Sequence, residues 1–140
     1  HLLDFDNHKG LQFFMKDLNS VYRRFPALYE NDFSGEGFQW IDANDSKNSI
    51  LSFIRYDKKK EHPVIVVVNL TPIPRHNYRI GVPEDKKWME ILNSDATQYG
   101  GSGQGNFGGV AANPVPYHGK DQSINVMLPP LGIVMFAAAP

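Results

Sequence analysis

The segment ILSFIRYDKKKEHPVIVVVNL, residues 50–70, contains two apolar runs separated by a cluster of charged residues. Residues 50–56 combine β-branched and aromatic side chains, which favour strands, and residues 57–62 have the polar composition of a hairpin tip. Residues 64–70 are apolar at almost every position, so both faces of that strand are expected to be buried. The segment therefore predicts a β-hairpin whose second strand lies in the middle of a sheet.

Similar short runs of strand-forming residues occur on both sides of this hairpin. Pro, Gly and Asn separate them, and the turn sequence Pro129-Pro130-Leu131-Gly132 joins the last pair. We expect these further strands at 38–41, 78–82, 88–92, 124–128 and 133–137. About seven short strands without a second helical pattern are typical of a mainly β protein with an antiparallel β-sandwich, and they argue against a parallel α/β sheet.

The N-terminal part of the chain has a different period. Apolar residues recur there every three to four positions, which places them on one face of an amphipathic α-helix. The residues of this stripe are Leu11, Phe14, Met15, Leu18, Val21, Tyr22 and Phe25. Because Pro26 disfavours helical geometry at the residue before it, we predict a helix over residues 8–24. The stripe can pack on the sheet of its own domain or on a neighbouring domain, and the sequence does not distinguish these arrangements.

Composition and charge argue against several classes of partner. The 140 residues include 14 Lys and Arg and 15 Asp and Glu, so no overall positive field attracts nucleic acid or an anionic membrane. No apolar run is long enough to span a bilayer, and the N-terminus lacks a signal-peptide pattern. Because the sequence has no cysteine, disulfides and thiolate chemistry are excluded, which fits a cytoplasmic location.

No group of residues has the spacing of a catalytic, cofactor or metal site. Residues 103–108 match the G-x-G-x-x-G pattern of dinucleotide-binding proteins, but that pattern requires a helix after it, and Gly109, Asn113 and Pro114 follow instead. We therefore interpret residues 99–109 as a long loop. The five histidines show no metal-ligand spacing, and the serines have no nucleophile-elbow context. The sequence predicts no catalytic residue, no cofactor and no metal.

Aromatic residues near strand ends or in loops are a further type of candidate. They are Trp40, Trp88, Tyr99, Phe107 and Tyr117. A flat aromatic ring can stack on the apolar face of a sugar ring. Large aromatic residues in strands are usually buried on one face, so Trp40 and Trp88 are expected more often in a core than in a binding site.

Several stretches of the chain resemble the C-terminal end of bacterial 1,4-α-glucan (glycogen) branching enzymes, which belong with the α-amylase superfamily. The motifs occur in the same order, and the resemblance extends over essentially the whole chain. They are HLLDFDNHKGLQ (1–12), WIDAND (40–45) followed by SILSF (49–53), TPIPRHNYRIGVP (71–83), YGGSG (99–103) and LPPLGIVMF (128–136). In that family a (β/α)8 barrel performs the chemistry and a small β-sandwich follows it. The resemblance implies that residues 1–30 are the end of the barrel with its last helix, and residues 36–140 the C-terminal β-sandwich.

The resemblance implies an enzymatic function for a larger parent protein. Branching enzymes transfer an α-1,4-glucan chain to a 6-hydroxyl with retention of configuration, which requires a nucleophilic carboxylate and a second carboxyl group that acts as acid and base. The family carries these groups on earlier barrel strands. The chain is therefore expected to be a non-catalytic piece of a hexosyltransferase of glycogen biosynthesis, without a cofactor of its own.

Two hypotheses follow for the role of the domain. In the first, the sandwich stabilises the barrel of the same parent chain, and the helix stripe points away from the sandwich. The isolated chain would then self-associate through Leu11, Phe14, Met15 and Leu18. In the second, the domain binds an α-glucan such as glycogen. The candidate contacts are then Trp40, Trp88, Tyr99 and Tyr117. A third alternative is that the chain belongs to another enzyme of the amylase superfamily, although residues 71–83 and 99–103 favour a branching enzyme.

Overall fold

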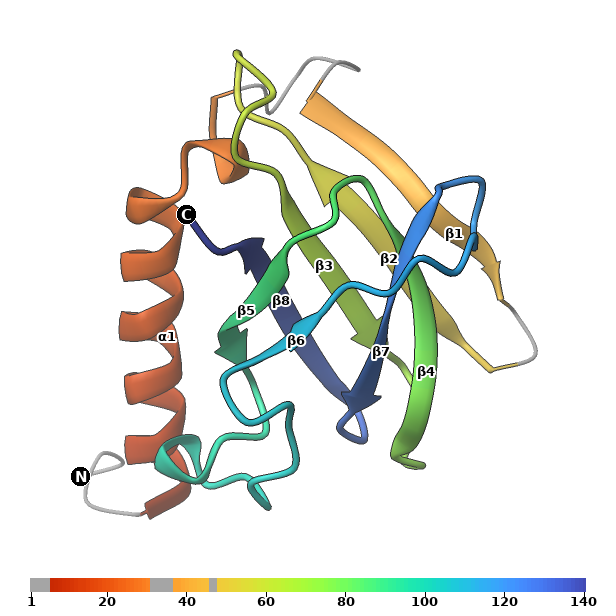
Figure 1. Cartoon of the computed structure of the whole chain (residues 1–140). Helices are drawn as coiled ribbons and strands as arrows, with labels where there is room; N and C mark the ends of the chain where they lie inside the picture. The colour runs from red at the N-terminus through yellow and green to blue at the C-terminus, as the bar shows by residue number, and fades with distance from the viewer. Residues whose placement is uncertain (1–5, 31–36, 46–47) are drawn as a thin grey trace.

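The computed structural model describes residues 6–30, 37–45 and 48–140. In these residues one helix, α1 (Asp6–Arg24), precedes eight strands (Figure 1). The strands are β1 (Phe38–Asp45), β2 (Ile50–Arg55), β3 (Val64–Asn69), β4 (Arg75–Val82), β5 (Lys87–Asn93), β6 (Gly109–Ala111), β7 (Gln122–Leu128) and β8 (Gly132–Ala138). Two short 3₁₀ helices, η2 (Pro26–Leu28) and η4 (Thr97–Tyr99), follow α1 and β5.

The strands form two antiparallel sheets that pack face to face as a β-sandwich. The larger sheet has the order β1-β2-β3-β8-β5-β6, and the smaller sheet consists of β4 and β7. In the larger sheet, Ile65 of β3 lies opposite Ile54 of β2 on one side and Phe136 of β8 on the other. Figure 1 shows β4 and β7 in front of this sheet. The predicted hairpin, the central position of its second strand and the mainly β antiparallel fold are confirmed.

All the predicted strands and the predicted helix are present, but the structure differs from the prediction in three strands. β4 begins at Arg75 rather than at Tyr78, and its pairing with β7 is irregular between these two residues. β1 continues to Asp45 because irregularities in its pairing with β2, between Trp40 and Asp42 and between Asp42 and Asp45, allow the strand to bend. The edge strand β6, which pairs with β5, was not predicted. Its sequence, Gly-Val-Ala, is too short and too rich in small residues to give a strand signal.

The space between the two sheets is filled by one core of apolar side chains. Its fully buried members include Ile54, Ile65, Ile80 and Phe136, which come from both sheets. Trp88 of β5 belongs to the same core and has no exposed surface. Alternate residues of β2 and β3 point into this core, as the period of two requires.

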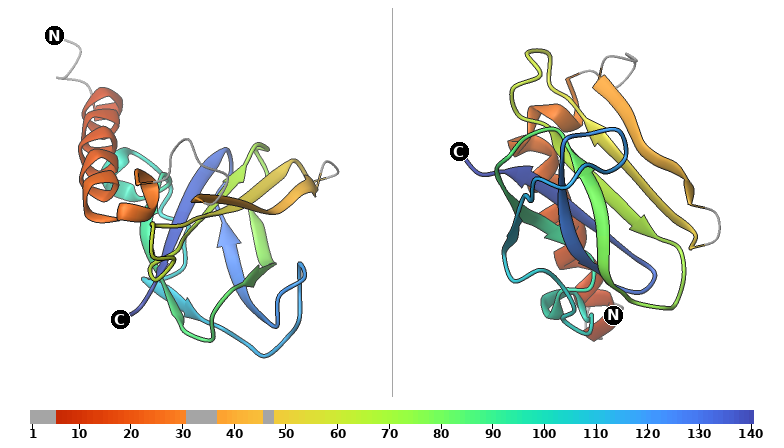
Figure 2. Two further views of the ribbon diagram at one scale, coloured as in Figure 1. Left: turned by 90° about the horizontal axis from the view of Figure 1, so that it is seen from above. Right: turned by 45° about the vertical axis from the view of Figure 1, so that its right-hand side comes forward.

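A second core lies on the opposite face of the larger sheet, beneath α1. Val21, Val64, Val66 and Leu92 are buried there, and Phe14 and Leu18 of the helix pack against them. Figure 2 shows α1 as a separate layer beside the sandwich. The expectation that Phe14 and Leu18 point away from the sandwich is therefore wrong. The apolar stripe covers a wider arc of the helix than the sheet can contact. Phe14, Leu18 and Val21 face the sheet. Leu11, Met15 and Tyr22 lie beside this contact and remain exposed.

The helix is attached to the loop after β5 by a close backbone approach. A side-chain carbon added to Gly10 would overlap the carbonyl oxygen of Tyr99. The Tyr99 ring packs edge-to-face on Phe14 with 5.2 Å between ring centroids, and its hydroxyl donates to the Asp17 carboxylate at 2.6 Å. Burial and the neighbouring Asp17 carboxylate raise the pKa of Tyr99 to about 12. Tyr99 is thus part of the contact that fixes the helix on the sandwich.

A polar contact joins the turn before β7 to both sheets. His118 Nδ1 accepts a hydrogen bond from the backbone N–H of Gly81 in β4 at 3.1 Å, and His118 Nε2 lies 3.5 Å from the Asp42 carboxylate in β1. Because Nδ1 is an acceptor in this arrangement, the imidazole ring is neutral. Burial lowers the pKa of His118, although the negative charges of Asp42 and Asp45 act in the opposite direction.

We predict that Gly10→Ala destabilises the chain even though alanine favours helices. The helix propensity gain is about 1 kcal/mol, whereas forcing a methyl group against the Tyr99 carbonyl costs about 1–3 kcal/mol and separates the helix from the loop. Urea unfolding of Gly10→Ala and of Asn19→Ala, an exposed position of the same helix, measures the difference. Equal or higher stability of Gly10→Ala would contradict the close approach.

We predict that stability falls below about pH 6.5 because of His118. Its pKa in the folded chain is lower than in the unfolded chain, so the unfolded chain binds the proton first as the pH decreases. The contribution of the neutral ring to the free energy of unfolding is therefore complete above the pKa that His118 has in the unfolded chain. Below that pKa the contribution is lost, by at most about 1.4 kcal/mol per pH unit. Thermal unfolding between pH 8 and pH 5 should show a shallower decrease for His118→Gln. The matched variant His62→Gln, at an exposed histidine, should retain the full decrease.

Candidate functional site

The described residues do not contain a group of three or more His, Asp or Glu side chains arranged to hold a metal ion. Within the same part of the chain, no helix is long and apolar enough to cross a membrane. The described residues also form an apolar surface and several cavities, which are the candidate sites.

One such surface is the part of the larger sheet that α1 does not cover. Figures 1 and 2 show α1 on the β5 and β8 side of this sheet, while β1 and β2 lie farther from the helix. We name this uncovered part the open face. Its apolar side chains are not fully buried and point to the same side of the sheet as α1, as does the charged Arg55 of β2. These apolar side chains are Phe38, Trp40, Leu51, Phe53 and Val68.

The three aromatic residues of the open face form one cluster. The ring of Phe38 stacks on Phe53 and meets Trp40 edge-to-face, with 5.0 Å between centroids in both pairs. Trp40 also contacts Phe53 edge-to-face at 5.8 Å. Even so, Trp40 is 50% exposed, so the expectation that it lies in the core is wrong. The reason is that β1 is an edge strand and Trp40 points to the face of the larger sheet that is opposite the smaller sheet. No described element covers that face at β1.

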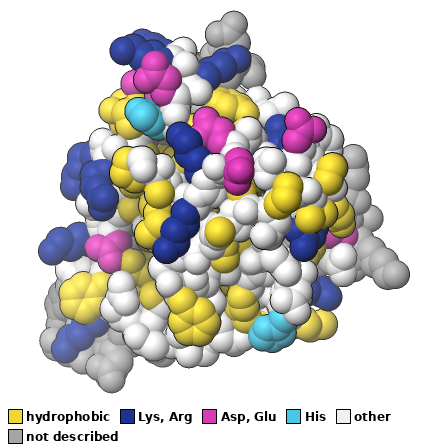
Figure 3. Space-filling model, viewed as in Figure 1, with side chains coloured by type: hydrophobic (Ala, Val, Ile, Leu, Met, Phe, Trp, Pro, Cys, Tyr) yellow, Lys and Arg dark blue, Asp and Glu magenta, His cyan; other side chains and the backbone are white. Residues whose placement is uncertain are grey.

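An apolar cavity of about 340 Å³ extends the open face toward the helix. It lies between α1 and the adjoining ends of β3 and β8, and its apolar lining includes Phe14, Val68 and Ile133. Leu70 and Leu131, which are exposed, lie at the same cavity. On the face that carries β4 and β7, by contrast, hydrophobic side chains are scattered among charged and polar ones (Figure 3). A continuous apolar surface of this kind is typical of an interaction site.

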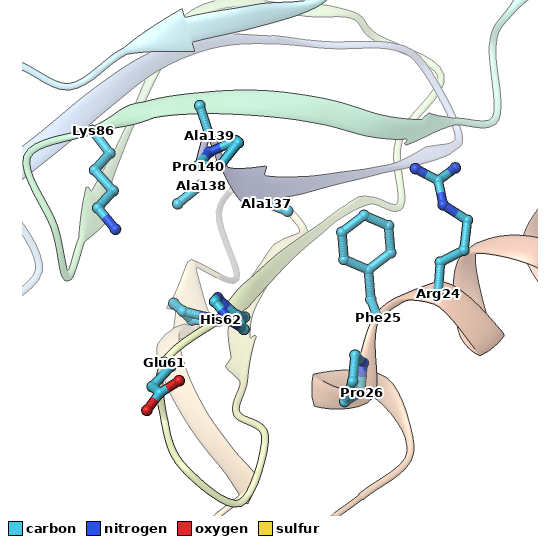
Figure 4. Close-up of a pocket in the computed structure, with 11 residues that line it drawn as sticks. Arg24, Phe25, Pro26, Glu61, His62, Lys86, Ala137, Ala138, Ala139 and Pro140 are labelled. Atoms are coloured by element: carbon cyan, nitrogen blue, oxygen red, sulfur yellow. The ribbon is translucent and has the colours of Figure 1, made fainter.

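A second cavity, of about 280 Å³, lies between the end of α1, the β2–β3 turn and the end of β8 (Figure 4). Phe25, Pro26 and Ala137 provide apolar lining. The charged groups of Arg24 and Lys86 also border it, but Figure 4 shows that they lie on different sides and do not converge on one point. The cavity therefore lacks the focused charge that binding of an anion requires.

The four predicted glucan contacts lie in different places. Trp88 is fully buried between the sheets, so its ring cannot reach a ligand and we withdraw it as a contact. Tyr99 is occupied by its contacts with α1, whereas Trp40 belongs to the open face. Tyr117 is 46% exposed and contacts His118 edge-to-face at 4.5 Å. The structure does not bring these residues together on one surface.

Phe107 is an exposed aromatic residue outside the four predicted contacts. It lies in the long loop before β6 and is more exposed than any other large hydrophobic residue among those described. The signal that could have identified it is the glycine-rich sequence around it, because Gly105, Gly108 and Gly109 have no side chain that could cover the ring.

The chain resembles known proteins over nearly all of its length. Residues 40–139 match the family described as "Alpha amylase, C-terminal all-beta domain". The chain is 50% identical over 134 residues to the 1,4-alpha-glucan branching enzyme GlgB of Aquifex aeolicus, which covers 96% of this chain and 21% of that enzyme. It is 51% identical over 139 residues to GlgB of Cereibacter sphaeroides, covering 99% and 19% respectively. The chain thus spans about a fifth of the length of the curated relatives it matches.

Solved structures show the same fold at low sequence identity. The α-amylase of H. orenii superposes with a TM-score of 0.54 at 16% identity, covering 92% of this chain and 20% of the amylase. The double mutant of MutB in complex with isomaltulose superposes with a TM-score of 0.51 at 18% identity. This match covers 89% of this chain and 17% of the MutB chain. The branching-enzyme relatives confirm the resemblance found in the sequence. Because the family model matches residues 40–139, most of the chain, this protein belongs to the family of alpha amylase C-terminal all-beta domains.

Proposed function

We propose that the chain is the C-terminal domain of a cytoplasmic 1,4-α-glucan branching enzyme and that it stabilises the catalytic barrel of that parent protein. The observation that carries the proposal is the open face, a partly exposed apolar surface on the same side of the sandwich as α1. Identity of about 50% to branching enzymes over nearly the whole chain supports the choice of parent. The α-amylase and MutB, at 16% and 18% identity, support another amylase-superfamily parent less well.

We further propose that residues 1–30 are the end of the barrel, including its last helix, and residues 36–140 the sandwich. The family model begins at residue 40, after α1, which supports this division. In addition, α1 lies on the outside of the larger sheet and contributes no strand to the sandwich. The junction itself falls at 31–35, outside the described residues.

The position of α1 supports a proposal for the surface that would meet the barrel. If the helix is the last element of the barrel, the preceding chain reaches the domain on the helix side of the larger sheet. The exposed side chains Leu11 and Met15 of α1 and the open face lie on that side. In the parent, these apolar surfaces would be buried against the barrel, and each buried Å² of apolar surface contributes about 25 cal/mol.

In this proposal the reaction belongs to the parent and not to the chain. The parent would transfer an α-1,4-glucan chain to a 6-hydroxyl in glycogen synthesis, using two carboxyl groups of the barrel. The role of the domain is to keep the barrel folded, so the chain alone would not transfer glucan.

We expect Trp40→Ala to destabilise the parent enzyme more than it destabilises the isolated chain. In the chain half of the indole is exposed, whereas in the parent its removal would leave a cavity, which costs about 3–5 kcal/mol for a buried Trp. Denaturation midpoints of both proteins, with and without the substitution, measure the difference. The matched variant is Tyr117→Ala, an aromatic residue of similar exposure outside the open face, which should change both proteins equally. Equal effects of Trp40→Ala on both proteins would refute the docking surface.

We also expect the isolated chain to self-associate at high concentration, because the surfaces that face the barrel are then open to water. The contact involves Leu11 and Met15, and not Phe14 and Leu18, which pack on the sandwich. Light scattering should show dimers or larger species for the chain and a smaller fraction of them for Leu11→Ser combined with Met15→Ser. Val115→Ser, at an exposed apolar residue of another loop, serves as the control and should leave association unchanged. A chain that stays monomeric at high concentration would count against this contact.

A further inference from the structure

Phe107 has a conformation and an exposure that the fold does not require. Its side chain is 105% exposed, so no described residue covers the ring. Its backbone φ is +52°, in the left-handed region that bulky residues rarely adopt. An apolar ring in water and a strained backbone both cost free energy, and such costs are concentrated at binding sites.

The residue before Phe107 holds the backbone from which the ring projects. Asn106 is buried, and its side chain donates to the Met127 carbonyl oxygen at 3.0 Å and accepts from the Met127 N–H at 2.7 Å. The Asn106 side chain and backbone N–H also donate to Glu90 Oε2, at 2.8 and 3.1 Å. Because these bonds tie the loop to strands of both sheets, Phe107 is presented by a rigid support.

The preceding part of the loop is ordered in the same way. The Asp95 carboxylate accepts hydrogen bonds from the backbone N–H groups of Ser102 and Gln104, each at 3.0 Å. The Asn93 side chain donates to the Gln104 carbonyl oxygen at 2.8 Å. A loop that is already ordered before a ligand arrives loses little conformational entropy on binding.

A cavity of about 270 Å³ lies in this loop, and Phe107 is part of its lining. Other lining residues include Thr97 and Gln98, whose side chains are exposed, and glycine backbone. Glu90 is the charged residue among those that line the cavity, and its two carboxylate oxygens accept hydrogen bonds from Asn93 and Asn106. The cavity is therefore polar but carries little free charge, which does not suit a phosphate or a strongly cationic ligand.

We propose that Phe107 and this cavity bind a sugar ring of a neutral glucan. The apolar face of a pyranose would stack on the Phe107 ring, and its hydroxyl groups would bond the Gln98 amide and the Thr97 hydroxyl. A protein partner fits less well, because an interface anchor normally sits among other apolar contacts and here the neighbours are glycine and polar residues. That the glucan is α-1,4-linked rests on the proposed function.

The site can be tested on the chain by titration with maltoheptaose, followed by amide NMR shifts. We expect saturable shifts at residues 97–98 and 103–109, and binding at least tenfold weaker for Phe107→Ala. Phe107→Trp should retain binding, because it keeps an aromatic platform. The matched control is Phe13→Ala, at a phenylalanine that is 51% exposed on α1, and it should bind like the unchanged chain.

Two outcomes would overturn the proposal, and a third would overturn the α-1,4 assignment of the glucan. The first is the absence of saturable shifts, or shifts that Phe107→Ala does not weaken. The second is that Phe107→Ala lowers the denaturation midpoint of the parent enzyme but not of the chain, which would make the ring a contact within the parent. The third is equal binding of cellohexaose, which would overturn the α-1,4 assignment. Since the barrel takes no part in the titration, a failure here is separable from a failure of the docking surface.

Discussion

The architecture depends on one strand that must be covered on both faces. β3 has the sequence Val-Ile-Val-Val-Val-Asn, and nearly all of its side chains are buried. Ile65 and Val67 are covered by the smaller sheet, whereas Val64 and Val66 on the other face need a separate cover. That cover is α1, so three layers follow from the composition of one strand. Because α1 reaches only part of the larger sheet, the rest of that side of the sheet, the open face, stays uncovered beside the helix.

Local patterns in the sequence were sufficient for most of the fold. The period of two in residues 50–56 and the apolar run in 64–70 predict the hairpin, and the spacing from Leu11 to Phe25 predicts the helix. The two tryptophans show what such patterns cannot predict. Both lie in strands, but Trp88 points between the sheets and is buried, whereas Trp40 points outward from an edge strand. Which strand lies at the edge is decided by pairing between distant segments, and the local sequence does not contain this information.

The candidate sites were harder to predict for a related reason. An apolar stripe of seven residues shows that the helix is amphipathic, but it does not show that Phe14 meets the sheet while Leu11 stays exposed. Similarly, the glycine-rich stretch 99–109 predicts a loop, but the bonds that order it come from residues far along the chain, such as Glu90 and Met127. The exposure of Phe107 results from these distant contacts. Sequence alone therefore identifies the aromatic residues and leaves their surroundings undetermined.

The surroundings of an exposed aromatic residue separate two kinds of surface in this domain. Trp40 touches Phe38 and Phe53 and lies beside an apolar cavity, so the addition of another apolar layer would complete a core. Phe107 has no comparable neighbour among the described residues and borders a cavity whose polar groups are already held in place. Water is easily removed from the first surface and strongly retained by the second. The first surface is suited to permanent burial within a larger protein. The second is suited to a hydroxylated ligand whose own hydrogen bonds can replace those made to water.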